Sequence, residues 1–183
     1  MKFVETPLPG AYVIEITPFT DERGLFARTY CRDEFRQINH ADEFLQFNHS
    51  LTRHKGSVRG MHYQIPPFSE IKLIRCVAGS VFDVIIDIRE GSPTFLQYFA
   101  VVLAAQTMNS VYVPRGFAHG FQTLEDDSQL IYHHTAIYKP GFENGIRFDD
   151  PGINIAWPLK PSMISSKDQS YPLLTNSFKG III

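Results

Sequence analysis

The stretch SVFDVIIDI, residues 80–88, decides the fold class because its residues alternate with the period of a β-strand. One face would be wholly apolar and consist of Phe82, Val84, Ile86 and Ile88. The other face would be mixed and consist of Val81, Asp83, Ile85 and Asp87. We therefore expect a strand in a sheet that packs one face on a hydrophobic core.

Similar runs rich in Val, Ile, Tyr and Phe recur between turn signals along the chain. They cover residues 11–17, 25–30, 57–64, 72–77, 96–105, 109–113, 119–124 and 128–138. This spacing predicts an all-β sandwich or barrel. We expect a short helix over 32–38, where Asp33 and Glu34 suit the positive N-terminal end. Prolines recur from about residue 139, so we expect one domain, 1–183, with a C-terminal segment that wraps the sandwich.

Composition excludes several classes of protein. The 183 residues are 44% hydrophobic and 20% charged, as is ordinary for a globular protein. A net charge of -2, with scattered basic residues, gives no continuous positive surface for nucleic acid. No run approaches the roughly 20 apolar residues of a membrane helix, so we expect a cytosolic protein. Cys31 and Cys76 lack any paired metal spacing and are interpreted as free thiols.

The segment GSVRGMHYQ, residues 56–64, places Arg59 and His62 three positions apart. On a regular strand these two side chains would point to opposite faces. Gly60 can host a bulge that turns both into one pocket. A cation beside an imidazole is the minimum of a binding site, although packing and surface roles remain open on this segment alone.

A second segment, VPRGFAHGF at 113–121, contains Pro-x-Gly-x-x-His ending at His119. This order resembles the second motif of the cupin superfamily, antiparallel jelly rolls that often carry a metal. The first cupin motif normally supplies His-x-His and a carboxylate, and the matching residues here are His62, Tyr63 and Gln64, with Glu70 further on. Because glutamine replaces the second imidazole, we expect no metal site.

A pocket without a metal suggests proton removal next to a carbonyl group. That reaction needs a neutral base, a positive group beside the developing oxyanion and an acid that returns a proton. His62, Lys72 and Tyr132 are residues of these three types.

A set of short motifs then occurs in a characteristic order. They are DERGLF at 21–26, QFNHS at 46–50, RGMHYQ at 59–64, KLI at 72–74, SPTF at 92–95, GFAHGF at 116–121, ENGI at 143–146, DP at 150–151, WP at 157–158 and SKD at 166–168. The ordered set resembles the dTDP-4-dehydrorhamnose 3,5-epimerase family from about residue 1 to 173. The resemblance implies a homodimeric jelly roll that acts on a nucleotide-linked 4-keto-6-deoxy sugar without a metal or organic cofactor.

The resemblance also implies roles for individual residues. His62 matches the base that removes the proton next to the ketone, and Asp168 matches the aspartate that pairs with it. Lys72 matches the lysine that faces the enolate oxygen, and Tyr132 matches the acid on the opposite side of the sugar. A carboxylate on one ring nitrogen would fix the imidazole tautomer and stabilise the imidazolium.

Other matches would bind the substrate. Arg23 and Arg59 suit the diphosphate, because a guanidinium offers two parallel donors. Gln46 and Asn48 would add neutral donors on one strand face, and His119 would lie in the cavity as a support for His62. The set near the nucleotide base and deoxyribose is Phe26, Tyr138 and Glu143.

The chain departs from the family pattern at three positions. Arg28 stands where a carboxylate is common, His133 where lysine is usual, and Glu70 where glutamine is frequent. Arg28 would therefore reverse a charge beside the nucleotide or sugar. These changes bear on the substrate and on whether one or two centres are inverted. A ketoisomerase, a non-catalytic sugar-binding or nucleotide-binding cupin and a metal-dependent cupin oxygenase remain the alternatives.

Overall fold

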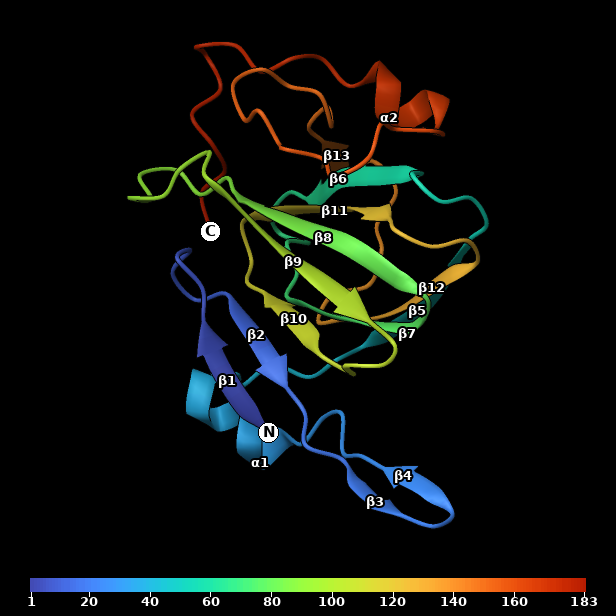
Figure 1. Ribbon diagram of the computed structural model, residues 1–183. Coiled ribbons are helices and arrows are strands. Elements are labelled where there is room, and N and C mark those ends of the chain that lie inside the picture. The colour runs from blue at the N-terminus through green and yellow to red at the C-terminus, as the bar shows by residue number, and fades with distance from the viewer.

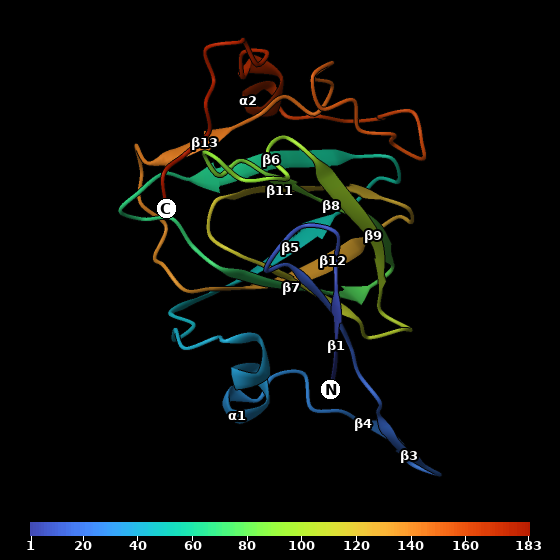
Figure 2. The same cartoon turned by 90° about the vertical axis from the view of Figure 1, so that its left-hand side faces the viewer.

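Two antiparallel sheets face each other in a sandwich, in a computed structural model that describes residues 1–183 (Figures 1 and 2). The six-stranded sheet has the order β1 (Lys2–Glu5), β2 (Tyr12–Glu15), β10 (Ser110–Val113), β7 (Lys72–Ala78), β12 (Ser128–His134) and β5 (Gln46–Thr52). The five-stranded sheet has the order β13 (Glu143–Gly145), β6 (Val58–Gln64), β11 (Phe117–Thr123), β8 (Ser80–Asp87) and β9 (Tyr98–Ala104). The prediction of an all-β, antiparallel jelly-roll sandwich is confirmed.

Short peripheral elements complete the fold. They are the hairpin of β3 (Phe19–Asp21) and β4 (Gly24–Phe26), the helices α1 (Arg32–Phe35) and η1 (Arg36–Ile38), and helix α2 (Ser166–Ser170). The helix expected over 32–38 is thus present as α1 and η1, which bury Phe35 and Ile38. No helix has both the length and the apolar character needed to span a membrane.

Strand β8 is buried on both faces, which corrects the expectation of a single core-facing side. Its mixed face contributes Val81 and Ile85 to the core between the two sheets. Its wholly apolar face instead packs under the C-terminal segment, where Ile153 and Ile155 belong to the same buried cluster as Val84. The C-terminal segment, which runs over the five-stranded sheet in Figure 1, therefore supplies a second apolar layer.

The strand prediction was also wrong elsewhere, because it missed β1, β3, β5 and β13 and extended one strand too far. Residues 46–52 form strand β5 at the edge of the larger sheet, although they were not predicted as a strand. Residues 25–30 were predicted as a strand, but only Gly24–Phe26 is extended, in a hairpin that projects away from the sandwich (Figure 1). Phe26 is 73% exposed there because the hairpin has no core of its own to pack against.

Gly60 hosts the bulge that the sequence predicted. The register between β6 and β11 shifts between the pairs His62–His119 and Arg59–Phe121. Gly60 has a φ of +129°, and a Cβ at this position would lie 2.5 Å from the Cα of Gly120. Glycine is required here because the two strands approach so closely. The consequence is that Arg59 and His62 both line one cavity.

The core between the sheets yields a prediction for stability. Ile85 is 1% exposed, so Ile85→Ala should lower the free energy of unfolding by about 2–5 kcal/mol through lost burial and a residual cavity. Val102→Ala on the neighbouring strand is the control, since Val102 is 47% exposed and the change should cost about 0.5 kcal/mol or less. Urea unfolding followed by fluorescence measures both, and equal losses for the two variants would contradict this packing.

Candidate active site

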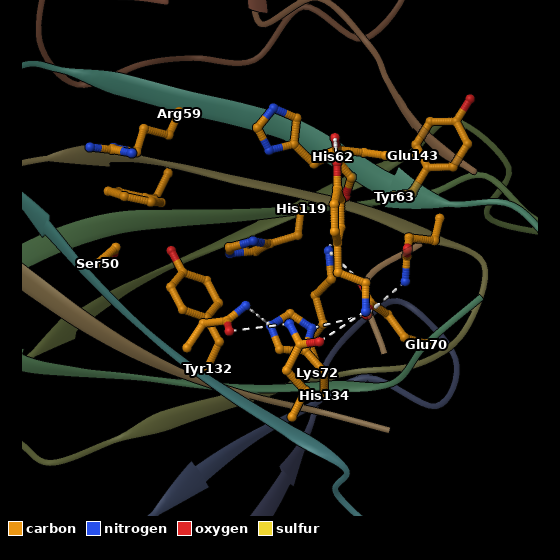
Figure 3. A pocket seen from close by; sticks show the side chains of 15 residues that line it. Ser50, Arg59, His62, Tyr63, Glu70, Lys72, His119, Tyr132, His134 and Glu143 are labelled. Atoms are coloured by element: carbon orange, nitrogen blue, oxygen red, sulfur yellow. Dashed lines mark hydrogen bonds and ion pairs between the residues drawn. The ribbon is translucent and has the colours of Figure 1, made fainter. Parts of the chain in front are cut away.

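A cavity of about 270 Å³ lies between the two sheets, where strands β5 and β6 border it. Inward-facing side chains of both sheets line it, together with residues that follow β12 (Figure 3). The lining residues are Gln46, Asn48, Ser50, Arg59, His62, Tyr63, Gln64, Glu70, Lys72, His119, Phe121, Tyr132, His134, Tyr138 and Glu143. Polar and ionisable groups are thus held inside an otherwise apolar sandwich.

His62 on β6 is hydrogen-bonded to a buried carboxylate from the C-terminal segment. Its Nε2 lies 2.8 Å from Oδ1 of Asp168, and the other carboxylate oxygen accepts from the Gly60 amide at 3.2 Å. Burial opposes ionisation of Asp168, but the hydrogen bond and charge of His62 outweigh it and hold the pKa of Asp168 below its ordinary value. An ionised Asp168 can only accept, so Nε2 of His62 carries a proton, and in the neutral form of the ring Nδ1 is then a free acceptor.

Lys72 on β7 presents an ammonium at the cavity wall. Its Nζ donates to the backbone oxygen of His62 at 3.2 Å and lies 3.3 Å from a carboxylate oxygen of Glu70. The other oxygen of Glu70 lies 3.0 Å from Nδ1 of His134. Burial raises the pKa of Glu70, yet the hydrogen bond to His134 and the charge of Lys72 outweigh this and keep that pKa below its ordinary value. The cavity therefore contains a cation whose counterion is also buried.

Tyr132 on β12 reaches the cavity from the sheet opposite His62. Its ring meets His119 edge-on at a centroid distance of 6.0 Å and stacks on His134 at 5.9 Å. Burial raises the pKa of Tyr132 well above its ordinary value, so the phenol keeps its proton at neutral pH. Tyr132 is therefore available as a proton donor.

His119 on β11 forms a second histidine–carboxylate pair. Its Nε2 lies 2.8 Å from Oδ2 of Asp83, and both side chains are almost fully buried. Burial lowers the pKa of His119 despite the charge of Asp83, so this imidazole is neutral. No group of three or more His, Cys, Asp or Glu side chains is arranged to hold a metal ion.

Hydrogen bonds link four cavity residues that the family resemblance assigns to substrate binding, which are Gln46, Asn48, Tyr138 and Glu143. The phenol of Tyr138 donates to Glu143 at 3.2 Å, and Glu143 also forms an ion pair with Lys167. Gln46 on β5 accepts from the Tyr138 amide at 2.9 Å and donates to Asn48 at 3.1 Å.

Three predicted binding residues lie outside the cavity of their own chain. Arg23 pairs with Asp21 at 2.6 Å in the β3–β4 hairpin, which also contains Phe26. Arg28 pairs with Glu34 on α1 at 2.9 Å. The structure brings all the other predicted residues into the cavity or, for Asp168, into contact with His62.

Sequence reasoning missed two partners of the site. Asp83 lies on the mixed face of its strand, and its carboxylate pairs with His119. His134 follows Tyr132 at a spacing of two, the spacing that places both on one strand face. Strand alternation was therefore the signal that could have found both residues.

Comparison with known proteins agrees with this geometry. The family model described as dTDP-4-dehydrorhamnose 3,5-epimerase matches residues 5–176. The enzyme of that name from Shigella flexneri is 40% identical over 169 residues, which cover 92% of this chain and 93% of that protein. The enzyme of that name from Methanothermobacter thermautotrophicus is 37% identical over 179 residues, covering 96% of each.

Solved structures give the same result. The dTDP-4-dehydrorhamnose 3,5-epimerase of Elizabethkingia anophelis superposes with a TM-score of 0.92 at 36% identity, over 97% of this chain and 98% of that one. The Legionella pneumophila epimerase in complex with dTDP-4-keto-L-rhamnose has a TM-score of 0.90 at 36% identity, over 94% and 92%. A 3'-monoepimerase from Streptomyces bikiniensis in complex with dTDP-quinovose has a TM-score of 0.86 at 32% identity, over 92% and 85%. This chain belongs to the dTDP-4-dehydrorhamnose 3,5-epimerase family.

Proposed function

We propose that this protein epimerises the carbons that flank the ketone of a dTDP-linked 4-keto-6-deoxy sugar, as a dTDP-4-dehydrorhamnose 3,5-epimerase. The observation that carries the proposal is the pair His62–Asp168, which lies across the cavity from the Tyr132 phenol and beside the Lys72 ammonium. Membership of the family and the dTDP sugars bound to related structures support this choice of substrate.

The chemistry follows from the protonation of these groups. Nδ1 of His62 takes the proton from the carbon next to the ketone, and Asp168 stabilises the imidazolium that results. The Lys72 ammonium stabilises the negative charge that develops on the carbonyl oxygen. Tyr132 returns a proton from the other face of the sugar, so the configuration at that carbon is inverted. Such a base typically contributes about 10² to 10⁴ in rate.

The three residues outside the cavity lead us to propose a homodimer. The β3–β4 hairpin exposes Phe19, Leu25 and Phe26, and an isolated apolar hairpin gains stability by packing on another surface. Near the cavity, Phe47 and Ile137 are also exposed, each at 64%. In the dimer, the hairpin of each subunit covers the cavity of the other and brings Arg23 to the diphosphate and Phe26 to the nucleotide base.

Solvent exchange tests the proposed reaction. With a dTDP-4-keto-6-deoxy sugar in D₂O, the wild-type protein should place deuterium on the carbons that flank the ketone, as followed by ¹H NMR. His62→Ala should reduce the exchange about 10² to 10⁴-fold, because the base is lost. Absence of exchange in the wild-type protein with the dTDP-4-dehydrorhamnose precursor would contradict the proposal.

The role of Tyr132 separates proton removal from inversion. Tyr132→Phe keeps the ring and its contacts with His119 and His134 but removes the donor. We expect deuterium exchange to continue while formation of the inverted product falls at least 10-fold, within the usual range for loss of an acid. Tyr12→Phe on β2, outside the cavity, is the control. Equal loss of exchange and of inversion would argue against an acid on the opposite face.

Complementation between two inactive variants tests the dimer. His62→Ala lacks the base and Arg23→Ala lacks the hairpin cation, so each alone should be weakly active. In a mixed dimer, one cavity would combine an intact His62 with the intact hairpin of the other subunit. Co-expression of the two variants should therefore give several times the summed activity of the separate proteins. Activity no greater than that sum would show that the hairpin does not act on a second subunit.

A further inference from the structure

Glu70 is a buried carboxylate that none of the proposed chemical steps uses. Its side chain is 8% exposed and accepts three hydrogen bonds or ion pairs, from Lys72 at 3.3 Å, His134 at 3.0 Å and Gln64 at 3.2 Å. A buried carboxylate is costly unless all its partners are present, and here each oxygen is engaged. Figure 3 shows Glu70 in the cavity with Lys72 and His134, the two ionisable residues that it contacts.

The contacts of Lys72 leave one direction free. An ammonium has three N–H donors. One bonds the backbone oxygen of His62, and one points to Glu70. Because Lys72 also lines the cavity, the third donor is available to a carbonyl oxygen of the substrate. Glu70 and the backbone of β6 thus hold the ammonium from two sides.

His134 extends the same network along the cavity wall. Its Nδ1 lies 3.0 Å from Glu70 and its Nε2 lies 3.3 Å from the Asn48 amide nitrogen, so a ring with its proton on Nδ1 hydrogen-bonds to both. Tyr132 stacks on the His134 ring. The Glu70 carboxylate therefore contacts three cavity groups directly, which are Lys72 of β7, His134 of β12 and Gln64 of β6, and it reaches Asn48 of β5 through His134.

The negative charge of Glu70 also affects the protonation of Lys72 during the proposed reaction. When His62 takes a proton, a positive charge appears near Lys72, and a like charge disfavours the protonated ammonium. The titratable groups that share the cavity with Lys72 are His62, Glu70, His119, Tyr132 and His134, and Asp83 is paired with His119. Four further charged or titratable residues line the cavity, which are Arg59, Tyr63, Tyr138 and Glu143. Asp168 is engaged by His62 and Asp83 by His119, so Glu70 is the carboxylate in direct contact with Lys72.

We propose that Glu70 is a positioning residue that holds the Lys72 ammonium in place and keeps it protonated while His62 carries the substrate proton. The effect of Glu70 on catalysis rests on the proposed function, whereas the effect of Glu70 on the protonation of Lys72 can be measured without any substrate. Glu70→Gln removes the charge with little change in shape, and Glu70→Leu removes both the charge and the hydrogen bonds. Glu125→Gln is the matched control, because Glu125 bonds Ser80 and lies outside the cavity.

The first test measures Lys72 without any substrate. Acetic anhydride labels deprotonated amines, and mass spectrometry of peptides gives the pH dependence of labelling for each lysine. In Glu70→Gln, labelling of Lys72 should begin about one pH unit lower than in the wild-type protein, since an opposite charge in contact is lost. The other lysines and the Glu125→Gln variant should not change. An unchanged Lys72 profile in Glu70→Gln would overturn the proposal.

The second test measures catalysis. For Glu70→Gln, the alkaline limb of kcat should move to lower pH by about one unit, with KM nearly constant. For Glu70→Leu, kcat at neutral pH should fall about 10- to 100-fold, while circular dichroism shows a folded protein. If the wild-type protein exchanges deuterium but the Glu70 variants keep its pH profile, the positioning role is wrong and the proposed function stands. If the wild-type protein shows no exchange, the proposed function fails, and the labelling experiment still decides the role of Glu70.

Discussion

The hydrogen bond between His62 and Asp168 is the interaction on which the rest of the site depends. It joins residues 106 positions apart in the sequence, across 2.8 Å, and connects β6 to the segment that covers the five-stranded sheet. The carboxylate is fixed by more than this bond, since Gly60 donates to it and Ser165 caps helix α2 by accepting from the Asp168 amide. Folding of the C-terminal segment therefore determines which ring nitrogen of His62 carries the proton.

The sandwich explains why neutral and charged groups coexist in one cavity. Its two sheets bring His62 and Tyr132 to opposite walls, and burial raises the pKa of the phenol so that the proton is kept. Lys72 remains beside the base because a buried counterion, Glu70, accompanies it. His62 and His119 are paired with carboxylates from distant parts of the chain, Asp168 and Asp83, and Lys72 is paired with Glu70, so these buried groups are not left without partners.

Local patterns in the sequence predicted those features that depend on neighbouring residues. The bulge at Gly60 follows from a glycine between Arg59 and His62, and the short helix over 32–38 follows from its acidic first turn. Strand β5 was missed because its inward positions, Gln46, Asn48 and Ser50, are polar and resemble a loop. They face a cavity rather than a core, so hydrophobic alternation is absent.

Features that depend on distant segments were not predictable from periodicity. Alternation in β8 identified its two faces but not the C-terminal residues that cover the apolar one. The hydrogen bond between His134 and Glu70 joins residues 64 positions apart, so no local spacing predicts it. The family resemblance grouped His62, Lys72 and Tyr132, which do line one cavity, whereas Arg23 and Phe26 lie outside that cavity in the β3–β4 hairpin.

The protonation of His62 is the most direct test of this account. Long-range ¹H–¹⁵N NMR of the histidine side chains at neutral pH, with assignment by comparison with His62→Ala, distinguishes the two neutral tautomers from the imidazolium. The account predicts a neutral His62 ring with its proton on Nε2 and a bare Nδ1. A proton on Nδ1 at neutral pH, in either the other tautomer or the imidazolium, would contradict the role of His62 as the base.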